Sequence, residues 1–160
     1  MKKYFLSVTI LVILSLITTW IIGNKQSKKY KEDFVSYKTA VKEALEGKNI
    51  NEALEKIEYM SAKDENNYIF NIDRANIYNQ KKDYSKAKDE FKKALEINNR
   101  LEKDSNFLIV YAKTLLNNKD YEECKRVIAK AKDIGVSEEL NNEIKDMLGK
   151  IDQGVHDNVK

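Results

Sequence analysis

The residue types that most often carry enzyme chemistry are scarce in this chain. Cys124 is the only cysteine and His156 the only histidine among 160 residues. A single cysteine can build neither a disulfide nor a cysteine-based zinc site. The histidine lies in a polar tail without neighbours that would serve as catalytic partners or ligands. Cys124 takes the place of a small residue in a recurring pattern, which favours a buried apolar role. We therefore expect no metal site and no cofactor.

Carboxylates are plentiful, and several of them occur as adjacent pairs. Neighbouring residues on a helix point about 100° apart, so the two acids of a pair do not converge on one reacting atom. The chain also lacks a glycine-rich phosphate loop and a G-x-S-x-G nucleophile turn. We therefore expect no catalytic residues, no enzyme activity and no small-molecule substrate. Such pairs include Asp64–Glu65, Asp89–Glu90, Glu122–Glu123 and Glu138–Glu139.

The overall composition favours long helices with solvated faces. Lys and Arg number 29 and Asp and Glu 26, which leaves a net charge of only +3. Charges of both signs are spread along the chain, as on the exposed faces of helices. Such a small charge excess gives no indication of nucleic-acid binding. The sequence contains no proline and only five glycines, so few residues interrupt helical segments.

The N-terminal residues 1–24 have the character of a signal-anchor or transmembrane helix. Residues 4–24 carry no charge. A helix over 4–22 would be about 28 Å long, close to the roughly 30 Å thickness of a bilayer core. Tyr4 and Trp20 lie near its ends, where aromatic rings favour the interface. The alternative is a cleaved signal peptide, but the run is longer than usual and lacks an A-x-A-like site. An uncleaved single-pass anchor is therefore predicted.

Two observations conflict over the orientation of this predicted anchor. Lysines are more numerous after the apolar run than before it, which by the positive-inside rule favours a cytoplasmic soluble domain. The Met-Lys-Lys start instead resembles a bacterial signal-anchor, which sends the following domain outward. We expect a single-pass protein of the cell membrane at a bacterial-type envelope, with an extracytoplasmic domain; a cytoplasmic domain is the alternative. The lysines are Lys2 and Lys3 before the run and Lys25, Lys28, Lys29 and Lys31 after it.

Residues 25–33 are predicted to form a basic juxtamembrane linker. The pattern of residues 34–149 predicts helices that occur in pairs. The predicted pairs are 34–46 with 50–63, 68–80 with 84–97, and 105–117 with 121–133. Gly47 and Gly135 follow predicted helix ends, a common position for glycine. Ser137 is a good N-cap for a last helix over 137–149. Residues 150–160 are expected to form a frayed polar tail.

The helix pairs repeat. Lys82-Asp83-Tyr84 returns as Lys119-Asp120-Tyr121, and more loosely as Lys48-Asn49-Ile50. The spacing is 34 residues from the first copy to the middle copy and 37 to the third. One helix pair cannot bury its apolar stripe alone, whereas stacked pairs can. We therefore predict repeats at about 34–67, 68–101 and 105–138 with a cap at 138–149. A helical bundle without repeats is the alternative.

The stripe of the middle copy resembles the tetratricopeptide repeat (TPR). Its pattern is matched by Ala75, Tyr78, Tyr84, Ala87, Phe91 and Ala94. The third copy matches at Ala112, Tyr121 and Ala131, with Leu115, Cys124 and Ile128 as substitutes. The first copy is the most divergent, with Ala44, Ile50, Ala53, Ile57 and Met60. The proline that usually ends each unit is replaced by Asn99 and Val136, and Tyr37 stands for the usual tryptophan. The resemblance implies an all-α, three-repeat solenoid with a capping helix, and the predicted transmembrane helix would precede it.

The resemblance also implies a concave groove, lined by the first helix of each repeat, that takes a peptide or helix of a protein partner. Only Lys38 matches the Lys/Asn clamp with which some family members grip a terminal carboxylate, so that mode is not expected. The predicted function is a membrane-tethered scaffold or adaptor; the alternative is a structural subunit of a membrane machine, assembled through the transmembrane helix or the convex face. The groove residues carried over by position are Lys38, Lys42, Ile72, Asn76, Asn79, Gln80, Ile109, Lys113, Leu116 and Asn117. Lys42, Asp73, Asn106 and Val110 occupy the remaining clamp positions without fitting them.

Overall fold

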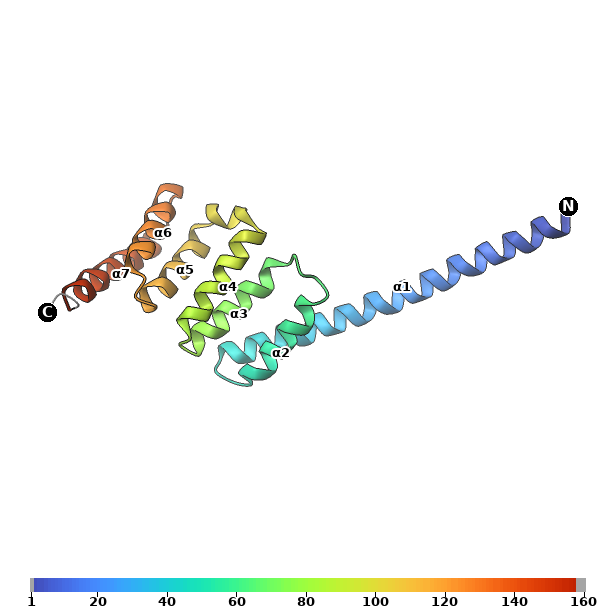
Figure 1. The fold of residues 1–160 in the computed structure, drawn as a ribbon, viewed down its shortest axis with the longest axis horizontal. Helices are drawn as coiled ribbons and strands as arrows, with labels where there is room; N and C mark the ends of the chain where they lie inside the picture. The colour runs from blue at the N-terminus through green and yellow to red at the C-terminus, as the bar shows by residue number, and fades with distance from the viewer. Residues whose placement is uncertain (1, 158–160) are drawn as a thin grey trace. The chain divides into compact units, whose positions relative to one another are not determined.

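A computed structural model describes the backbone of residues 2–157 and the side chains of residues 13–154, and its regular elements are all helical (Figure 1). The chain divides into two units, residues 1–39 and 40–160, which are described separately. The elements are α1 (Lys2–Leu45), α2 (Ile50–Ser61), α3 (Tyr68–Gln80), α4 (Tyr84–Ile97), the 3-10 helix η1 (Asn99–Lys103), α5 (Ser105–Asn117), α6 (Tyr121–Ile134) and α7 (Glu138–Asp157).

The first unit consists of α1 as far as residue 39. The segment 25–33, expected as a linker, is part of this continuous helix. Tyr30, Phe34 and Tyr37 follow one another at helical spacing, and their ring centroids lie 6.3 and 5.5 Å apart. The Lys38 ammonium lies 5.0 Å from the centroid of the Tyr37 ring, which is close enough for a cation–π interaction.

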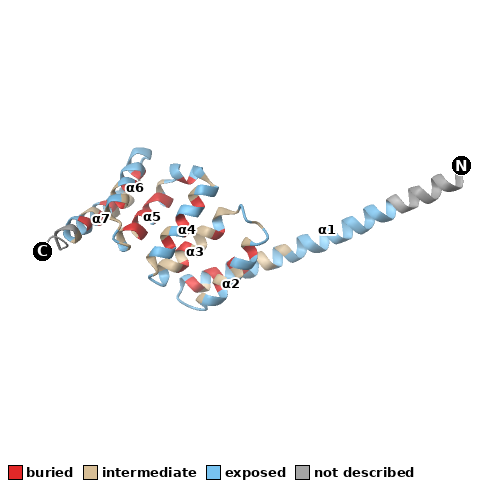
Figure 2. Cartoon of the chain, viewed as in Figure 1, coloured by how far each residue is buried: buried red, intermediate tan, exposed pale blue. Residues whose placement is uncertain are grey.

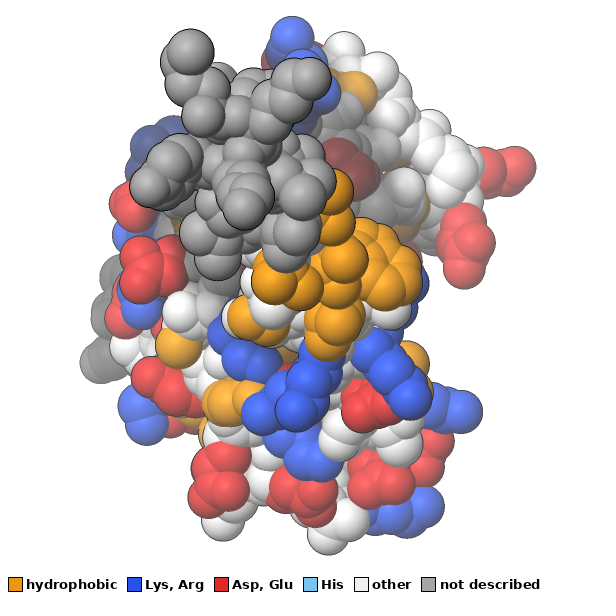
Figure 3. All heavy atoms as spheres, turned by 90° about the vertical axis from the view of Figure 1, so that its right-hand side faces the viewer, with side chains coloured by type: hydrophobic (Ala, Val, Ile, Leu, Met, Phe, Trp, Pro, Cys, Tyr) orange, Lys and Arg blue, Asp and Glu red, His pale blue; other side chains and the backbone are white. Residues whose placement is uncertain are grey.

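The predicted transmembrane helix requires correction. Within the described residues, no helix combines the length and the apolar character that crossing a membrane requires. A spanning helix needs about 20 predominantly apolar residues. The described part of the uncharged apolar run in α1 extends only from Ile13 to Ile22, and Lys25 and Lys28 follow soon after. Both the anchor over 1–24 and the single-pass membrane localisation are therefore wrong predictions; the side chains of residues 1–12 lie outside the described part. Figure 3 shows exposed hydrophobic side chains directly beside Lys and Arg side chains.

The second unit is built from antiparallel helix pairs, and α3 with α4 and α5 with α6 are its most extensively packed pairs (Figure 1). Side-chain N-caps begin α3, α4 and α5; for example, the Asp83 carboxylate accepts a hydrogen bond from the Lys86 N–H at 3.3 Å. The turns inside both pairs place a lysine in the left-handed region, with φ of 61° at Lys82 and 64° at Lys119. The recurring Lys-Asp-Tyr motif is therefore a turn followed by an N-cap and the first helical residue.

The core of the second unit alternates small and large side chains. Ala75, Ala94 and Phe91 are fully buried, and the Phe91 ring meets Phe107 edge-on with 5.6 Å between centroids. The small residues let two helices approach, while the aromatic ring fills the space between them and the next pair. Figure 2 shows buried residues on the sides by which the helices face one another. This packing fixes the relative positions of α3, α4 and α5.

A network around a buried ion pair connects consecutive helix pairs. Arg74 Nη1 of α3 lies 2.8 Å from Glu90 Oε2 of α4, and these side chains are only 15% and 9% exposed. Arg74 Nη2 also donates to Ser61 Oγ of α2 at 3.1 Å, while Lys93 Nζ lies 2.7 Å from the second Glu90 oxygen. The network therefore joins α2, α3 and α4.

The last helix extends further than the sequence predicted. α7 continues to Asp157, beyond the predicted end at 149, and Ile151 is fully buried in the core together with Ile144. The tail expected at 150–160 is therefore helical up to residue 157. The opposite face of α7 carries exposed polar residues, as the end of a helical stack requires.

Two glycines of α7 give a matched test of this extension. A Cβ added at Gly154 would lie 2.5 Å from the Tyr121 Oη, whereas a Cβ at Gly149 would meet nothing within 4 Å. Gly154→Ala should therefore lower the free energy of unfolding by about 1–2 kcal/mol, because the Tyr121 ring must move. Gly149→Ala should raise it by roughly 0.5–1 kcal/mol, because alanine favours the helix. Urea denaturation measures both, and equal effects at both sites would contradict the docked end of α7.

Candidate protein-binding groove

The ten groove residues predicted from sequence lie on α1, α3 and α5. Lys38 belongs to the first unit and Lys42 to the second, and both are exposed on α1. On α3, Ile72, Asn76 and Asn79 are half-buried and Gln80 is exposed; on α5, Ile109 is buried, Lys113 and Leu116 are half-buried and Asn117 is exposed.

Ile109, Asn79 and Lys113 contact other helices of the fold. Ile109 is only 1% exposed and belongs to the same core cluster as Ile144 of α7. Asn79 Nδ2 donates to Thr114 Oγ1 at 2.8 Å and thereby links α3 to α5. Lys113 Nζ lies 2.6 Å from Glu143 Oε2 of α7, so an acid from its own chain balances its charge. Their side chains stabilise the packing of successive helices.

Ile72 and Asn76, in contrast, line a cleft of about 380 Å³. Its wall is formed by α3, α4, η1 and α5, so it lies where the first helices of two successive repeats meet. The other lining residues are Tyr68, Phe91, Leu101, Asp104, Asn106, Phe107 and Val110.

The cleft combines apolar surfaces with a few polar groups. Phe91, Leu101 and Phe107 are buried, while Val110 is 38% exposed. The carboxylate of Asp104 caps α5 and accepts a hydrogen bond from the Phe107 N–H at 3.1 Å. Apolar lining with a few fixed polar groups is typical of binding sites in proteins.

Sequence reasoning missed most of this lining. Asn106 and Val110 were identified from the sequence only as residues that do not fit the carboxylate clamp. They occupy the positions of α5 that correspond to Ile69 and Asp73 of α3. Leu101 belongs to η1, a helix that the helical periodicity did not predict. The three extra residues of this connector were the available signal, because they mark the place where the repeat departs from its 34-residue period.

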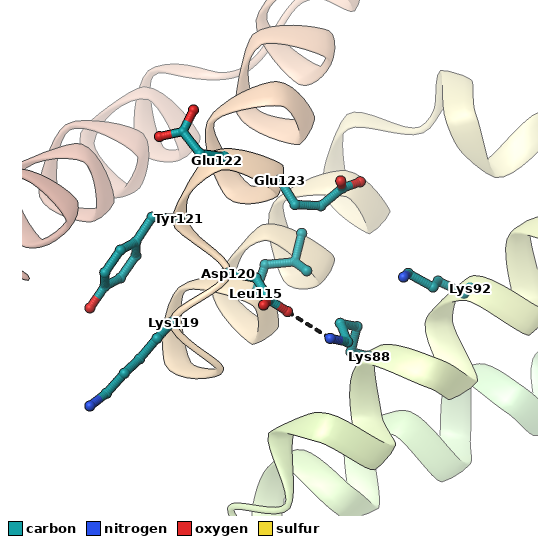
Figure 4. A pocket seen from close by; sticks show the side chains of 8 residues that line it. All are labelled: Lys88, Lys92, Leu115, Lys119, Asp120, Tyr121, Glu122 and Glu123. Carbon is teal, nitrogen blue, oxygen red and sulfur yellow. Dashed lines mark hydrogen bonds and ion pairs between the residues drawn. The ribbon is translucent and has the colours of Figure 1, made fainter. Parts of the chain in front are cut away.

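A second cleft, of about 470 Å³, lies between α4 and α6 and was not predicted (Figure 4). Lys88 Nζ reaches across it to Asp120 Oδ2 at 2.8 Å. This hydrogen bond, with another from Asn118, holds the pKa of Asp120 below its usual value, and the same bond raises the pKa of Lys88. Both groups are therefore charged at neutral pH, and the pair is lost only as the pH falls through the lowered pKa of Asp120.

The described residues offer little for catalysis. No group of three or more His, Cys, Asp or Glu side chains among them could hold a metal ion. Cys124 is buried, as predicted, and its Sγ donates to the carbonyl of Ala112 at 3.2 Å. Burial raises the pKa of its thiol to about 11, so the reactive thiolate is rare at neutral pH. The side chain of His156 lies outside the described part.

Comparison with known proteins agrees with the repeat architecture. Residues 70–100, which span α3 and α4, match the family model of the tetratricopeptide repeat. A search of curated proteins gave no match. Repeats of this family are typically non-catalytic modules that mediate protein–protein interactions. The match and the all-helical architecture together support a tetratricopeptide repeat at residues 70–100.

Proposed function

We propose that the second unit binds a protein partner by holding a peptide or helix of that partner in the cleft between α3 and α5. The observation that carries this proposal is the coincidence of the cleft with Ile72 and Asn76, two residues placed in the groove by repeat position alone. The cleft also lies beside the residues 70–100 that match the family.

The chemistry of the cleft suits a polypeptide segment. Ile72, Phe107 and Val110 offer apolar surface that a partner side chain can cover, and removal of this surface from water drives association. Asn76 and Asn106 each present a donor and an acceptor, which can pair with a peptide backbone. Apolar contacts then supply affinity, and the amides fix the position of the bound segment.

The remaining predicted residues extend this proposed surface. Gln80 and Asn117 are exposed near the C-terminal ends of α3 and α5, and Leu116 is half-buried beside Asn117. Lys113 contributes less positive charge than its type suggests because it is paired with Glu143. A longer partner segment would run from the cleft across these residues, while the cleft supplies the main anchor.

The proposal is tested by a matched pair of lysine substitutions. Val110 and Ile97 are both 38% exposed, but only Val110 lines the cleft. Random twelve-residue peptides are selected for binding to the full chain, and their Kd values are measured by fluorescence anisotropy. Val110→Lys should weaken binding by about tenfold or more, because a charge would enter an apolar site. Ile97→Lys should leave binding unchanged, with circular dichroism confirming that both variants are folded.

Two results would count against the proposal. Peptides that bind Val110→Lys as tightly as the original chain must use another surface. If selection on the original chain enriches no peptide, the cleft does not act as a general peptide site.

A further inference from the structure

The residues that line the α3–α5 cleft carry a single formal charge, which belongs to Asp104. The other lining residues are apolar, phenolic or amide side chains. We infer that the cleft selects a partner segment in which a large apolar side chain stands next to a Lys or Arg. This inference rests on the proposed function and specifies the chemistry of the segment that the cleft receives.

The apolar part of this specificity follows from the composition of the cleft. Phe91 and Phe107 already form an edge-on pair with 5.6 Å between centroids, and both line the cleft together with Leu101, Ile72 and Val110. A further aromatic ring or a large aliphatic side chain can pack against such surfaces, whereas a methyl group would leave most of the 380 Å³ unfilled.

The charge preference follows from the position of Asp104. Its Oδ1 is held by the Phe107 N–H at 3.1 Å, which fixes the carboxylate at the start of α5. Among the described residues, no ion pair to Asp104 is observed. η1 carries three charged residues: Glu102 pairs with Lys130 at 2.7 Å, and Arg100 and Lys103 are both exposed. A cation of the partner can therefore approach the second carboxylate oxygen.

The predicted groove lysine of α5 does not set the charge of the cleft, because Lys113 is paired with Glu143 and does not line the cleft. The α4–α6 cleft differs in its lining, which carries charges of both signs and includes the Lys88–Asp120 pair. The unpaired charge beside an apolar cleft is thus a feature of the α3–α5 site.

Asp104→Asn isolates the charge. Asparagine caps a helix about as well as aspartate, so the variant keeps the start of α5 while it loses the negative charge. The matched control is Asp89→Asn, which removes the same charge from an exposed residue of α4 that does not line the cleft. The probes are four pools of random twelve-residue peptides with a fixed central pair: Phe-Lys, Phe-Glu, Ala-Lys or Ala-Glu.

Binding of each pool to the full chain is measured by fluorescence anisotropy at low and moderate salt. The Phe-Lys pool should bind about tenfold more tightly than Ala-Lys, because the phenyl ring removes apolar surface from water. It should bind roughly threefold more tightly than Phe-Glu, a difference that salt reduces. Asp104→Asn should abolish the Lys-over-Glu preference and retain the preference for Phe; Asp89→Asn should change neither.

The outcomes separate this inference from the proposed function. If Val110→Lys reduces binding but the four pools bind equally, the cleft binds peptides without the specificity inferred here. A Lys preference that survives Asp104→Asn would also overturn the inference, because another group would then carry the negative charge. If no pool binds the original chain, both the inference and the proposed function fail.

Discussion

Replacing Phe91 by alanine should lower the free energy of unfolding by about 3–5 kcal/mol. Phe91 is 0% exposed, and its ring centroid lies 5.6 Å from that of Phe107 and 5.7 Å from that of Tyr111. The side chain of α4 thus packs against two aromatic residues of α5. Truncation would leave a cavity between two successive repeats, and the loss would combine apolar transfer with the cost of that cavity. Urea denaturation followed by far-UV circular dichroism measures the change.

The adjacent residue supplies the control for this prediction. Lys92 is exposed on the same helix, and Lys92→Ala should change the free energy of unfolding by no more than about 0.5 kcal/mol. A loss below roughly 1.5 kcal/mol for Phe91→Ala would show that the interface between the repeats is loosely packed. An equal loss for both variants would indicate a general effect on α4 rather than a cavity.

The helices of the second unit were predictable where local signals agree. The predicted ranges 68–80, 84–97 and 105–117 coincide with α3, α4 and α5. The helices α3, α4 and α5 begin after a residue whose side chain accepts a backbone N–H, as Asp83 and Asp104 do. The periodic apolar stripe continues up to a turn in which Lys82 or Asn98 ends the helical geometry. Local capping and periodicity therefore determine these boundaries.

Tertiary packing overrode the local signals at two places. Gly149 and Gly154 favour an early end to α7, but the buried Ile151 extends its apolar face and holds the helix against the core. The connector after α4 looks like a short loop, yet it forms η1 and buries Leu101. Both features depend on apolar surfaces of helices that are distant in the sequence. Local helix propensity carries no information about these surfaces.

For the candidate site, the repeat register of its residues could be predicted from the sequence, but the side-chain pairings within the fold could not. Repeat position placed Ile72 and Asn76 on the side of α3 that lines the cleft. The same register placed Ile109 in the groove, although it is buried in the core. The partners of Asn79 and Lys113 lie 35 and 30 residues further along the chain, at Thr114 and Glu143. Such distant pairings decide which polar groups are available to a ligand, and a single sequence does not reveal them.

Removing one member of the Arg74–Glu90 pair should destabilise the second unit by about 2–4 kcal/mol. Their side chains are 15% and 9% exposed, and the shortest N–O distance is 2.8 Å. Arg74→Met would leave Glu90 buried with Lys93 as its remaining ion-pair partner, at 2.7 Å. Glu90→Leu would leave the Arg74 guanidinium with weaker contacts, to Ser61 Oγ at 3.1 Å and to the exposed Glu58 Oε2 at 4.0 Å. Each single change therefore leaves an incompletely compensated charge in a partly dry site.

The double variant Arg74→Met/Glu90→Leu should be more stable than either single variant, because both buried charges are absent. Lys130→Met is the control: it breaks the exposed Lys130–Glu102 pair, whose N–O distance of 2.7 Å is similar, and should cost less than about 1 kcal/mol. Urea denaturation of the four variants and the original chain gives the coupling energy. Additive losses in the double variant would show that Arg74 and Glu90 act independently. A large coupling would establish that this pair ties α3 to α4 beside the proposed cleft.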